Sequence, residues 1–375
     1  MALRVGLVGR CVNTPHLRGM GKFVYELLRQ SKTHEDIAWT VFGDDPRHPM
    51  TVPEGRGIGT DVFTFRGDRF HFWEQLGLPR RAAGHAVDLL HCTEGTLPWW
   101  QPIPTVVTVH DTIMWDDHDG GHASSFYFDT LLPAALSKCA AVLTDSESSR
   151  KDILAKWPLL EKKLSVIPMG VAEEYFADEP AQLPASIRGA IGEAPYAVYF
   201  GGPIERKRFT WARDTVARSG HPELKLVACG FATDARRTAE KELTGELRDK
   251  VVFAPFLSEP EVRGLVRGAV AVLYPTLYEG FGFPAVEAQA AGVPVIFSAL
   301  GSLAELVGPL AFVVEPNDMA AWVHAVHKAL ALKGAARAER AAEARLWAQG
   351  FSWQRSFERH LAVYRSVAAS RGAPR

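Results

Sequence analysis

The sequence predicts an α/β protein of two domains, each built around a doubly wound parallel β-sheet. The chain has 375 residues, 47% of them hydrophobic, which is enough for two separate cores. Short runs rich in β-branched residues alternate with longer stretches of helical pattern, and this alternation is typical of βαβ units. Because both halves show it, we expect two sheets of the same class.

The strand-like runs follow one another along the whole chain. In the first half they are LRVGLVG (3–9), IAWTVFG (37–43), VDLLH (87–91), TVVTVH (105–110) and AAVLTDS (140–146). In the second half they are YAVYFGG (196–202), KLVACG (225–230), VVFAPF (251–256), VAVLYP (270–275), VPVIFS (293–298) and AFVVEP (311–316). Several runs end in polar or glycine-containing turns, such as His110-Asp111, Gly201-Gly202 and Gly230, and ligands of α/β sheets bind at such strand ends.

The segment 173–195 separates the two sets of strands. It contains three prolines, mixed charge and no sustained periodicity, so we interpret it as an interdomain linker. We therefore expect an N-terminal domain over 1–172 and a C-terminal domain over 196–350. The remaining segment, 351–375, has aromatic and aliphatic residues at near-helical spacing. It predicts an amphipathic helix that packs back on the N-terminal domain.

The charge balance and the cysteines exclude several classes of protein. Lys and Arg number 42 against 43 Asp and Glu, so no overall field attracts nucleic acid or anionic lipid. The four cysteines are far apart and form no CxxC pair, which indicates neither a zinc module nor a disulfide framework. No apolar run is long enough for a signal peptide or a membrane span. We expect a cytoplasmic protein, and the richness in Ala, Arg and Gly suggests a bacterial gene.

The stretch YEGFGFPAVEAQAAGVPV (278–295) places two carboxylates, Glu279 and Glu287, around a glycine-rich turn. It follows a predicted strand and precedes a predicted helix. Gly280 and Gly282 allow a tight turn that exposes consecutive N–H groups at the positive, N-terminal end of that helix. Such donors suit a phosphate or a set of sugar hydroxyls, and the two carboxylates are arranged as acceptors for hydroxyl groups.

This stretch strongly resembles the E-x7-E segment of the retaining nucleotide-sugar glycosyltransferases of family GT4, which have the GT-B fold. Four further segments resemble the same family: RGMGKFVYELLRQ (18–30), TVVTVHDTI (105–113), TDSESSRKDIL (144–154) and LSVIPMGVAEEYF (164–176). The resemblance implies two Rossmann-like domains that face each other across a cleft. It also implies a nucleotide sugar as the donor substrate.

The resemblance assigns roles around the E-x7-E segment. It implies that Glu279 contacts the donor sugar and that Glu287 binds the ribose diol. The backbone amides of Phe281, Gly282 and Phe283 are expected to hold sugar hydroxyls. The alternative interpretation is two surface glutamates that favour the dipole of the following helix.

Three cations follow the Gly-Gly strand end in YFGGPIERKRF (199–209). Many family members carry Arg directly after the strand glycine, whereas this chain has Gly202. By resemblance, Lys207 keeps the family's lysine position, and we expect Arg206 to replace the missing guanidinium. These two cations would neutralise the leaving diphosphate, so we expect no metal and no other cofactor. A solvated run of charges is the alternative.

Other candidate donor contacts lie at further strand ends. His110 ends an apolar strand, and the resemblance implies that it contacts the donor sugar near the reacting carbon. A buried strand-end histidine is the alternative. Gly19 and Gly21 are expected to bring the backbone close to the phosphates, and the nucleobase is expected near Phe256 and Leu257.

The acceptor side is expected in the first half of the chain. Trp99 and Trp115 belong to a group of aromatics in loops there, and sugar faces stack on such rings. Packing in the core is the alternative for each ring. The acidic pairs in the loops lack a pattern of further ligands around them, so we expect no metal site.

The sequence therefore predicts a retaining, metal-independent glycosyltransferase. It would transfer a sugar from a nucleotide-sugar donor to a hydroxyl of a small-molecule or glycan acceptor, in bacterial glycan or glycosylated natural-product biosynthesis. A nucleotide-sugar epimerase or isomerase on the same scaffold is one alternative. A non-catalytic nucleotide-sugar binding protein is the other. No nucleic acid partner is expected, and membrane association is not indicated.

Overall fold

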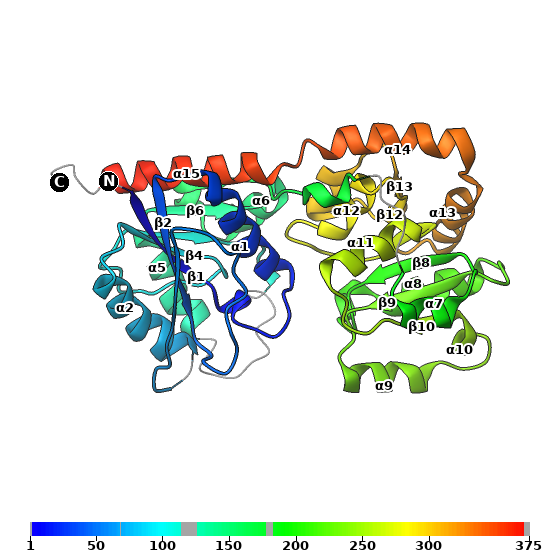
Figure 1. Cartoon of the computed structure of the whole chain (residues 1–375), viewed down its shortest axis with the longest axis horizontal. Coiled ribbons are helices and arrows are strands. Elements are labelled where there is room, and N and C mark those ends of the chain that lie inside the picture. Colours follow the sequence, from blue (N-terminus) through cyan, green and yellow to red (C-terminus); the bar gives the residue numbers. More distant parts are fainter. Residues whose placement is uncertain (1, 68, 114–125, 178–182, 371–375) are drawn as a thin grey trace. The chain divides into compact units, whose positions relative to one another are not determined.

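The computed structural model describes residues 2–67, 69–113, 126–177 and 183–370, and the chain divides into two compact units (Figure 1). Unit 1 comprises Met1–Gly170 and Ser352–Arg375, and unit 2 comprises Val171–Phe351. Each unit contains one parallel sheet with helices packed against it, so the predicted α/β class is confirmed. The placement of the two units across a cleft stays a prediction.

The sheet of unit 1 has seven strands in the order β3-β2-β1-β4-β5-β6-β7. They are β1 (Leu3–Val8), β2 (Ile37–Gly43), β3 (Ile58–Val62), β4 (Leu89–Cys92), β5 (Thr105–Thr108), β6 (Ala141–Thr144) and β7 (Leu164–Val166). All of their pairings are parallel. The strand order reverses between β1 and β4, and ligands of doubly wound sheets bind beyond the carboxyl ends of the strands at such a point.

Helices pack against this sheet. They are α1 (Gly19–Gln30), α2 (Leu78–Gly84), α5 (Leu132–Lys138) and α6 (Glu147–Lys156). The 3-10 helices are η1 (Arg10–Val12), η2 (Ser31–Thr33) and η5 (Pro158–Lys163), and the π-helices are η3 (Arg69–Gly77) and η4 (Tyr127–Leu131). The start of α6 is fixed by Ser146, whose hydroxyl accepts a hydrogen bond from the backbone N–H of Ser149. That cap matters for the site, because α6 begins directly beyond the end of β6.

The C-terminal helix α15 (Trp353–Ser370) belongs to unit 1 and packs against α1 and β4 (Figure 1). Its apolar face is buried, including Trp353, Phe357 and Tyr364. The Tyr364 hydroxyl and His91 Nδ1 lie 2.7 Å apart, which ties the helix to the centre of the sheet. The near-helical aromatic spacing of the sequence therefore corresponds to one face of this helix.

The sheet of unit 2 has six strands in the order β10-β9-β8-β11-β12-β13. They are β8 (Tyr196–Phe200), β9 (Lys225–Cys229), β10 (Val251–Phe253), β11 (Ala271–Tyr274), β12 (Val295–Phe297) and β13 (Ala311–Val313). These pairings are also parallel. The order reverses between β8 and β11, so the loops that follow these two strands lie at the switch point.

The helices and short turns of unit 2 lie before, between and after these strands. They are η6 (Glu173–Tyr175), α7 (Ala185–Ile191), η7 (Glu205–Lys207), α8 (Phe209–Arg218), α9 (Thr233–Glu242), α10 (Leu247–Lys250), α11 (Glu259–Gly268), α12 (Phe283–Ala290), η8 (Gly301–Leu306), α13 (Met319–Ala331) and α14 (Gly334–Ala348). In the described part of the chain, no helix combines the length and the apolar character needed to span a membrane.

The segment expected as a linker, 173–195, differs from that expectation in its described residues. The units divide after Gly170, and the segment belongs to unit 2, where it forms η6 and α7. Tyr175 and Ile187 are fully buried there. The sequence of this segment does not reveal its helices, because helices of one or two turns are too short to show a hydrophobic period, and the prolines and mixed charge resemble those of a linker.

Candidate active site

A cluster of one carboxylate and two cations forms where β8 and β11 end. Glu279 follows β11, and Arg206 and Lys207 lie in η7, which follows β8. Glu279 Oε1 lies 2.7 Å from Lys207 Nζ and 3.1 Å from Arg206 Nη1. The Glu279 side chain is 10% exposed. The structure thus brings together three residues that the sequence analysis selected from segments about seventy positions apart.

The backbone joins the two loops of this cluster as well. Arg206 Nη1 donates to the Tyr278 carbonyl at 2.5 Å, and the Leu277 N–H donates to the Arg206 carbonyl at 3.0 Å. Arg206 therefore has a fixed position beside Glu279. Besides its ion pair with Glu279, the Lys207 ammonium group lies over the face of the Tyr274 ring, 5.5 Å from its centroid.

Arg208 is directed elsewhere. Its backbone adopts the left-handed conformation, with φ of 54°. Its guanidinium donates to the Pro316 carbonyl and to Asn317, and it stacks on the Trp211 ring at 4.0 Å. Of the three consecutive cations, two therefore contact Glu279, and the third, Arg208, contacts the loop at Pro316 and Asn317.

Gly202 occupies a position that a side chain cannot enter. Its φ is +60°, and a Cβ atom there would lie 2.4 Å from the Gly230 carbonyl oxygen. The ends of β8 and β9 approach each other through these two glycines. This conformation leaves no room for a side chain at the position where many family members carry arginine.

The glycine turn before α12 is held in place by side chains. Gly282 is the N-cap of α12 and has φ of +104°, and a Cβ there would meet Leu303 at 2.5 Å. The Ser302 hydroxyl donates to the carbonyls of Glu279 and Phe281 at 2.7 and 3.1 Å. Phe283 begins α12. The turn is therefore rigid, as expected for a loop that presents N–H groups to a ligand.

Glu287 lies on α12 and is largely buried. Its Oε2 accepts a hydrogen bond from the Tyr175 hydroxyl at 3.1 Å. Tyr175 lies in the segment 164–176, which resembles the family, but its sequence context does not mark it as a partner of Glu287. Phe256 is exposed and Leu257 is buried, and both follow the edge strand β10.

In unit 1, residues that follow three neighbouring strands meet at the carboxyl edge of the sheet. They are Thr93 after β4, His110 after β5 and Asp145 after β6. His110 Nδ1 lies 2.6 Å from Asp145 Oδ2, and Nε2 lies 3.0 Å from the Thr93 carbonyl oxygen. The Phe23 ring packs edge-on against the imidazole, with 5.2 Å between centroids. His110 is thus confined by its neighbours.

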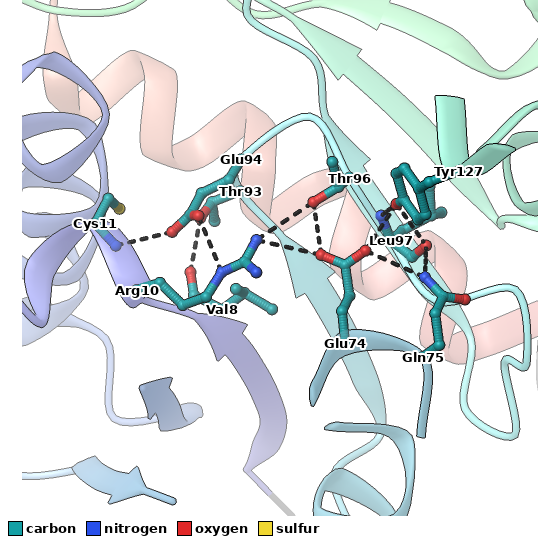
Figure 2. Close-up of polar contacts among 10 residues, drawn as sticks. All are labelled: Val8, Arg10, Cys11, Glu74, Gln75, Thr93, Glu94, Thr96, Leu97 and Tyr127. Atoms are coloured by element: carbon teal, nitrogen blue, oxygen red, sulfur yellow. Dashed lines mark hydrogen bonds and ion pairs between the residues drawn. The ribbon is translucent and has the colours of Figure 1, made fainter. Parts of the chain in front are cut away.

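A second polar network lies at the same edge (Figure 2). Arg10, two residues beyond β1, pairs through Nε with Glu94 at 3.0 Å and through Nη2 with Glu74 at 3.2 Å. Glu94 also accepts from the Cys11 N–H at 2.8 Å. Burial alone would lower the pKa of Arg10, but the charges of Glu94 and Glu74 outweigh it and raise that pKa. Arg10 therefore stays a cation.

Glu74 is the most deeply buried member of this network, with a side chain 1% exposed. It accepts hydrogen bonds from Thr96 at 2.6 Å and from the Tyr127 hydroxyl at 2.7 Å (Figure 2). The neighbouring Thr93 hydroxyl donates to the Val8 carbonyl at 2.6 Å. The network fixes the loop after β4, and with it the carbonyl that faces His110. Breaking such a buried pair by removing one partner typically costs about 3–5 kcal/mol.

The remaining predicted contacts in unit 1 are more dispersed. Gly19 begins α1, and a Cβ on Gly21 would lie 2.7 Å from the Cys11 carbonyl oxygen, so Gly21 allows α1 to approach η1. Trp99 is half exposed, with Lys138 Nζ 3.6 Å from the centroid of its ring. Trp115 lies outside the described residues.

Solved structures first identify the class of the fold. Sucrose-phosphate synthase from Thermosynechococcus elongatus superposes with a TM-score of 0.73 at 19% identity, over 98% of this chain and 100% of that one. Anabaena Alr3699/HepE in complex with UDP and glucose gives 0.75 at 17% identity, over 97% and 100%. At these identities the likeness defines the fold, which is that of the GT-B glycosyltransferases.

Family profiles identify the family. The profile described as Glycosyltransferase Family 4 matches residues 17–175, and the profile described as Glycosyl transferases group 1 matches residues 191–347. The chain belongs to glycosyltransferase family GT4, as the E-x7-E segment predicted.

Curated relatives carry several glycosyl-transfer activities in their names. MMP alpha-(1->4)-mannosyltransferase of Mycolicibacterium hassiacum is 30% identical over 71% of this chain and 66% of its own. O-antigen chain mannosyltransferase B of Escherichia coli is 26% identical over 52% of each chain. D-inositol 3-phosphate glycosyltransferase of an Arthrobacter species is 31% identical over 54% of this chain and 50% of its own. The match covers between half and two thirds of each relative's length.

Proposed function

We propose that the protein transfers a sugar from a nucleotide-sugar donor to a hydroxyl group of an acceptor in glycan biosynthesis. The single observation that carries this proposal is the cluster of Arg206, Lys207 and Glu279 at the switch point of the unit 2 sheet. Two cations beside a carboxylate match a donor that joins a diphosphate to a polyhydroxyl sugar. Membership of the family and the names of the relatives support the same class of reaction.

Donor binding exchanges the partners within this cluster. The diphosphate takes the ammonium group of Lys207 and the guanidinium of Arg206, and the Glu279 carboxylate turns to sugar hydroxyls. Charge grows on the diphosphate as its bond to the sugar breaks, so fixed cations at that point stabilise the transition state more than the ground state. We infer that they do so without a metal ion, and that the anomeric configuration is retained.

The ribose is assigned to Glu287. Its carboxylate has two oxygens with several acceptor positions, and the Tyr175 hydroxyl uses one oxygen. The Tyr175 hydroxyl therefore helps to orient the carboxylate. A vicinal diol donates two hydrogen bonds with a spacing that a carboxylate accepts.

A panel of nucleotide sugars in a thermal-shift assay tests the proposal. A donor at 100 times its Kd adds about 2.7 kcal/mol to the free energy of unfolding. The bound donor is then incubated with candidate acceptors, and products are separated by mass. Transfer to an acceptor supports the proposal, release of an altered sugar nucleotide without acceptor would mean an isomerase, and binding without turnover would mean a binding protein.

A further inference from the structure

We propose that Asp145 is a positioning residue that holds His110 as an imidazolium cation, so that His110 does not act as a general base in the transfer reaction. This inference rests on the proposed function for its meaning in catalysis. The state of His110 itself is a property of unit 1 and is measurable without any substrate.

The geometry of the ring carries the inference. Both nitrogens of His110 face oxygen atoms, the Asp145 carboxylate at 2.6 Å and the Thr93 carbonyl at 3.0 Å. A carbonyl oxygen only accepts hydrogen bonds, so Nε2 must carry a proton. A second proton then lies between Nδ1 and Asp145. Imidazole is ordinarily more basic than a carboxylate, with pKa values of about 6.5 and 3.9. Burial raises the pKa of Asp145, but Asp145 also raises the pKa of His110, so this proton resides on the ring.

The surroundings of the ring favour the same state. Among the described residues, Asp145 and Asp111 are negative groups that act on His110, and Phe23 of α1 packs edge-on against it. Two further titratable groups in the described part of the chain, His91 and His360, also interact with His110; burial lowers their pKa values, so they stay neutral. Burial alone would lower the pKa of His110, but the charge and the hydrogen bond of Asp145 outweigh it and raise that pKa.

Both partners are almost closed to solvent, which makes the pair strong. The exposed fractions are 12% for the His110 side chain and 2% for Asp145. A buried carboxylate without a cation is unfavourable, and so is a buried imidazolium without an anion. The two charges stabilise each other, and neither is replaced easily by water.

The chemical consequence concerns the acceptor proton. A general base needs a free lone pair directed at the proton that it removes. In His110 one nitrogen donates to a carbonyl and the other donates to Asp145, so no lone pair remains. A group other than the His110 ring must therefore accept the acceptor proton. The His110–Asp145 pair has no net charge and holds a fixed position just beyond the end of β5.

NMR of the imidazole nitrogens of the full chain tests this directly. We expect both His110 nitrogens to be protonated at neutral pH, with a titration midpoint above that of an exposed histidine. In Asp145→Asn, which keeps the size of the side chain, the midpoint should fall by about one unit or more. A wild-type midpoint at or below the ordinary value, or a single protonated nitrogen at neutral pH, would overturn the proposal.

Ser149→Ala is the matched control. The Ser149 hydroxyl donates to the His110 backbone carbonyl at 2.9 Å, so the substitution removes a contact to the same residue without touching the ring. Its His110 midpoint should equal that of the wild type. An equal fall in both variants would mean that local packing, and not the carboxylate, sets the protonation state.

The pH dependence of turnover supplies the functional arm. We expect kcat to fall on the alkaline side as His110 loses its proton, and the Asp145→Asn profile to shift that fall to lower pH. A rise of kcat through the His110 midpoint would identify a general base and overturn the proposal. If the chain turns over no nucleotide sugar, the proposed function fails, while the NMR titration still decides the state of His110.

Discussion

Lys207 Nζ lies 2.7 Å from Glu279 Oε1, and this contact joins the loops that follow two neighbouring strands, β8 and β11. A lysine paired with a carboxylate before donor binding has a defined position and a defined exchange partner. In the proposed function, the diphosphate would displace the carboxylate from the cation and free the carboxylate for the sugar. We therefore expect binding of the two halves of the donor to be coupled through this one ion pair.

The cation cluster gives the first prediction. Lys207→Ala and Arg206→Ala should each lower kcat by about 10²-fold or more, with a smaller change in KM, because charge on the diphosphate grows in the transition state. Arg208→Ala is the matched control, since this guanidinium contacts Pro316, Asn317 and Trp211. Its kcat should stay near that of the wild type. Steady-state kinetics with the donor found in the thermal-shift panel measures kcat for each variant. A large loss of kcat in Arg208→Ala beside a normal kcat in Arg206→Ala would mean that Arg208, and not Arg206, is the second cation of the site.

The two glutamates should separate by ligand fragment. Glu287→Ala should weaken binding of the bare nucleoside diphosphate, whereas Glu279→Ala should leave that binding intact and depress turnover of the whole donor. A hydrogen bond to a charged partner contributes about 1.5–3 kcal/mol, so each effect should be roughly 10- to 150-fold. Titration calorimetry with the diphosphate, followed by kinetics, measures both. Equal losses on both ligands would refute the division of roles.

Gly202 provides a prediction on stability. Gly202→Ala places a Cβ 2.4 Å from the Gly230 carbonyl at φ of +60°, so the backbone must move, and the free energy of unfolding should fall well beyond the roughly 1–2 kcal/mol that left-handed backbone alone costs. Gly220→Ala is the control, because Gly220 has φ of +68° and nothing within 4 Å of the added Cβ. Urea unfolding of both variants separates the cost of the steric clash with Gly230 from the cost of placing alanine in a left-handed backbone conformation. A Gly202→Arg protein that is as stable as the wild type would contradict the explanation for the missing arginine.

The parts of the fold that the sequence predicted are the ones with a local signal. Each strand-like run of the second half forms a strand of unit 2. In unit 1, β3 and β7 were not predicted, and both are edge strands, which need less apolar surface. In β3, Gly59 and Thr60 are exposed and the buried residue is the charged Asp61, and β7 has only three residues.

The site residues also differ in how far the sequence could predict them. Glu279, Arg206 and Lys207 stand in segments with a family pattern, so the sequence selected them before their contact was known. Asp145 and Arg10 had a weak signal, a charged residue just beyond an apolar run. Their partners depend on which strands are neighbours, and that order comes from packing of the whole sheet. Glu74 lies within η3 and had no signal at all, because a buried glutamate on a helix resembles a solvent-exposed one in sequence.

The last prediction concerns acid and the C-terminal helix. His360 of α15 is buried between the rings of Phe23, His91 and Tyr364, and burial lowers the pKa of His360 to about 4. Between pH 6.5 and 4 the unfolded chain binds a proton that the folded chain does not, so the free energy of unfolding falls as the pH falls through this window. A shift from 6.5 to about 4 corresponds to roughly 3 kcal/mol at the acid end.

Urea unfolding of the wild type and of His360→Leu at several pH values measures this contribution. Leucine cannot bind a proton, so the variant should lose that part of the acid destabilisation between pH 6.5 and 4. The remaining slope includes His91, whose pKa burial also lowers and whose Nδ1 lies 2.7 Å from the Tyr364 hydroxyl. Parallel curves for the two proteins across the whole window would mean that His360 is protonated in the folded state, and that its burial between α15 and its neighbours does not control its charge.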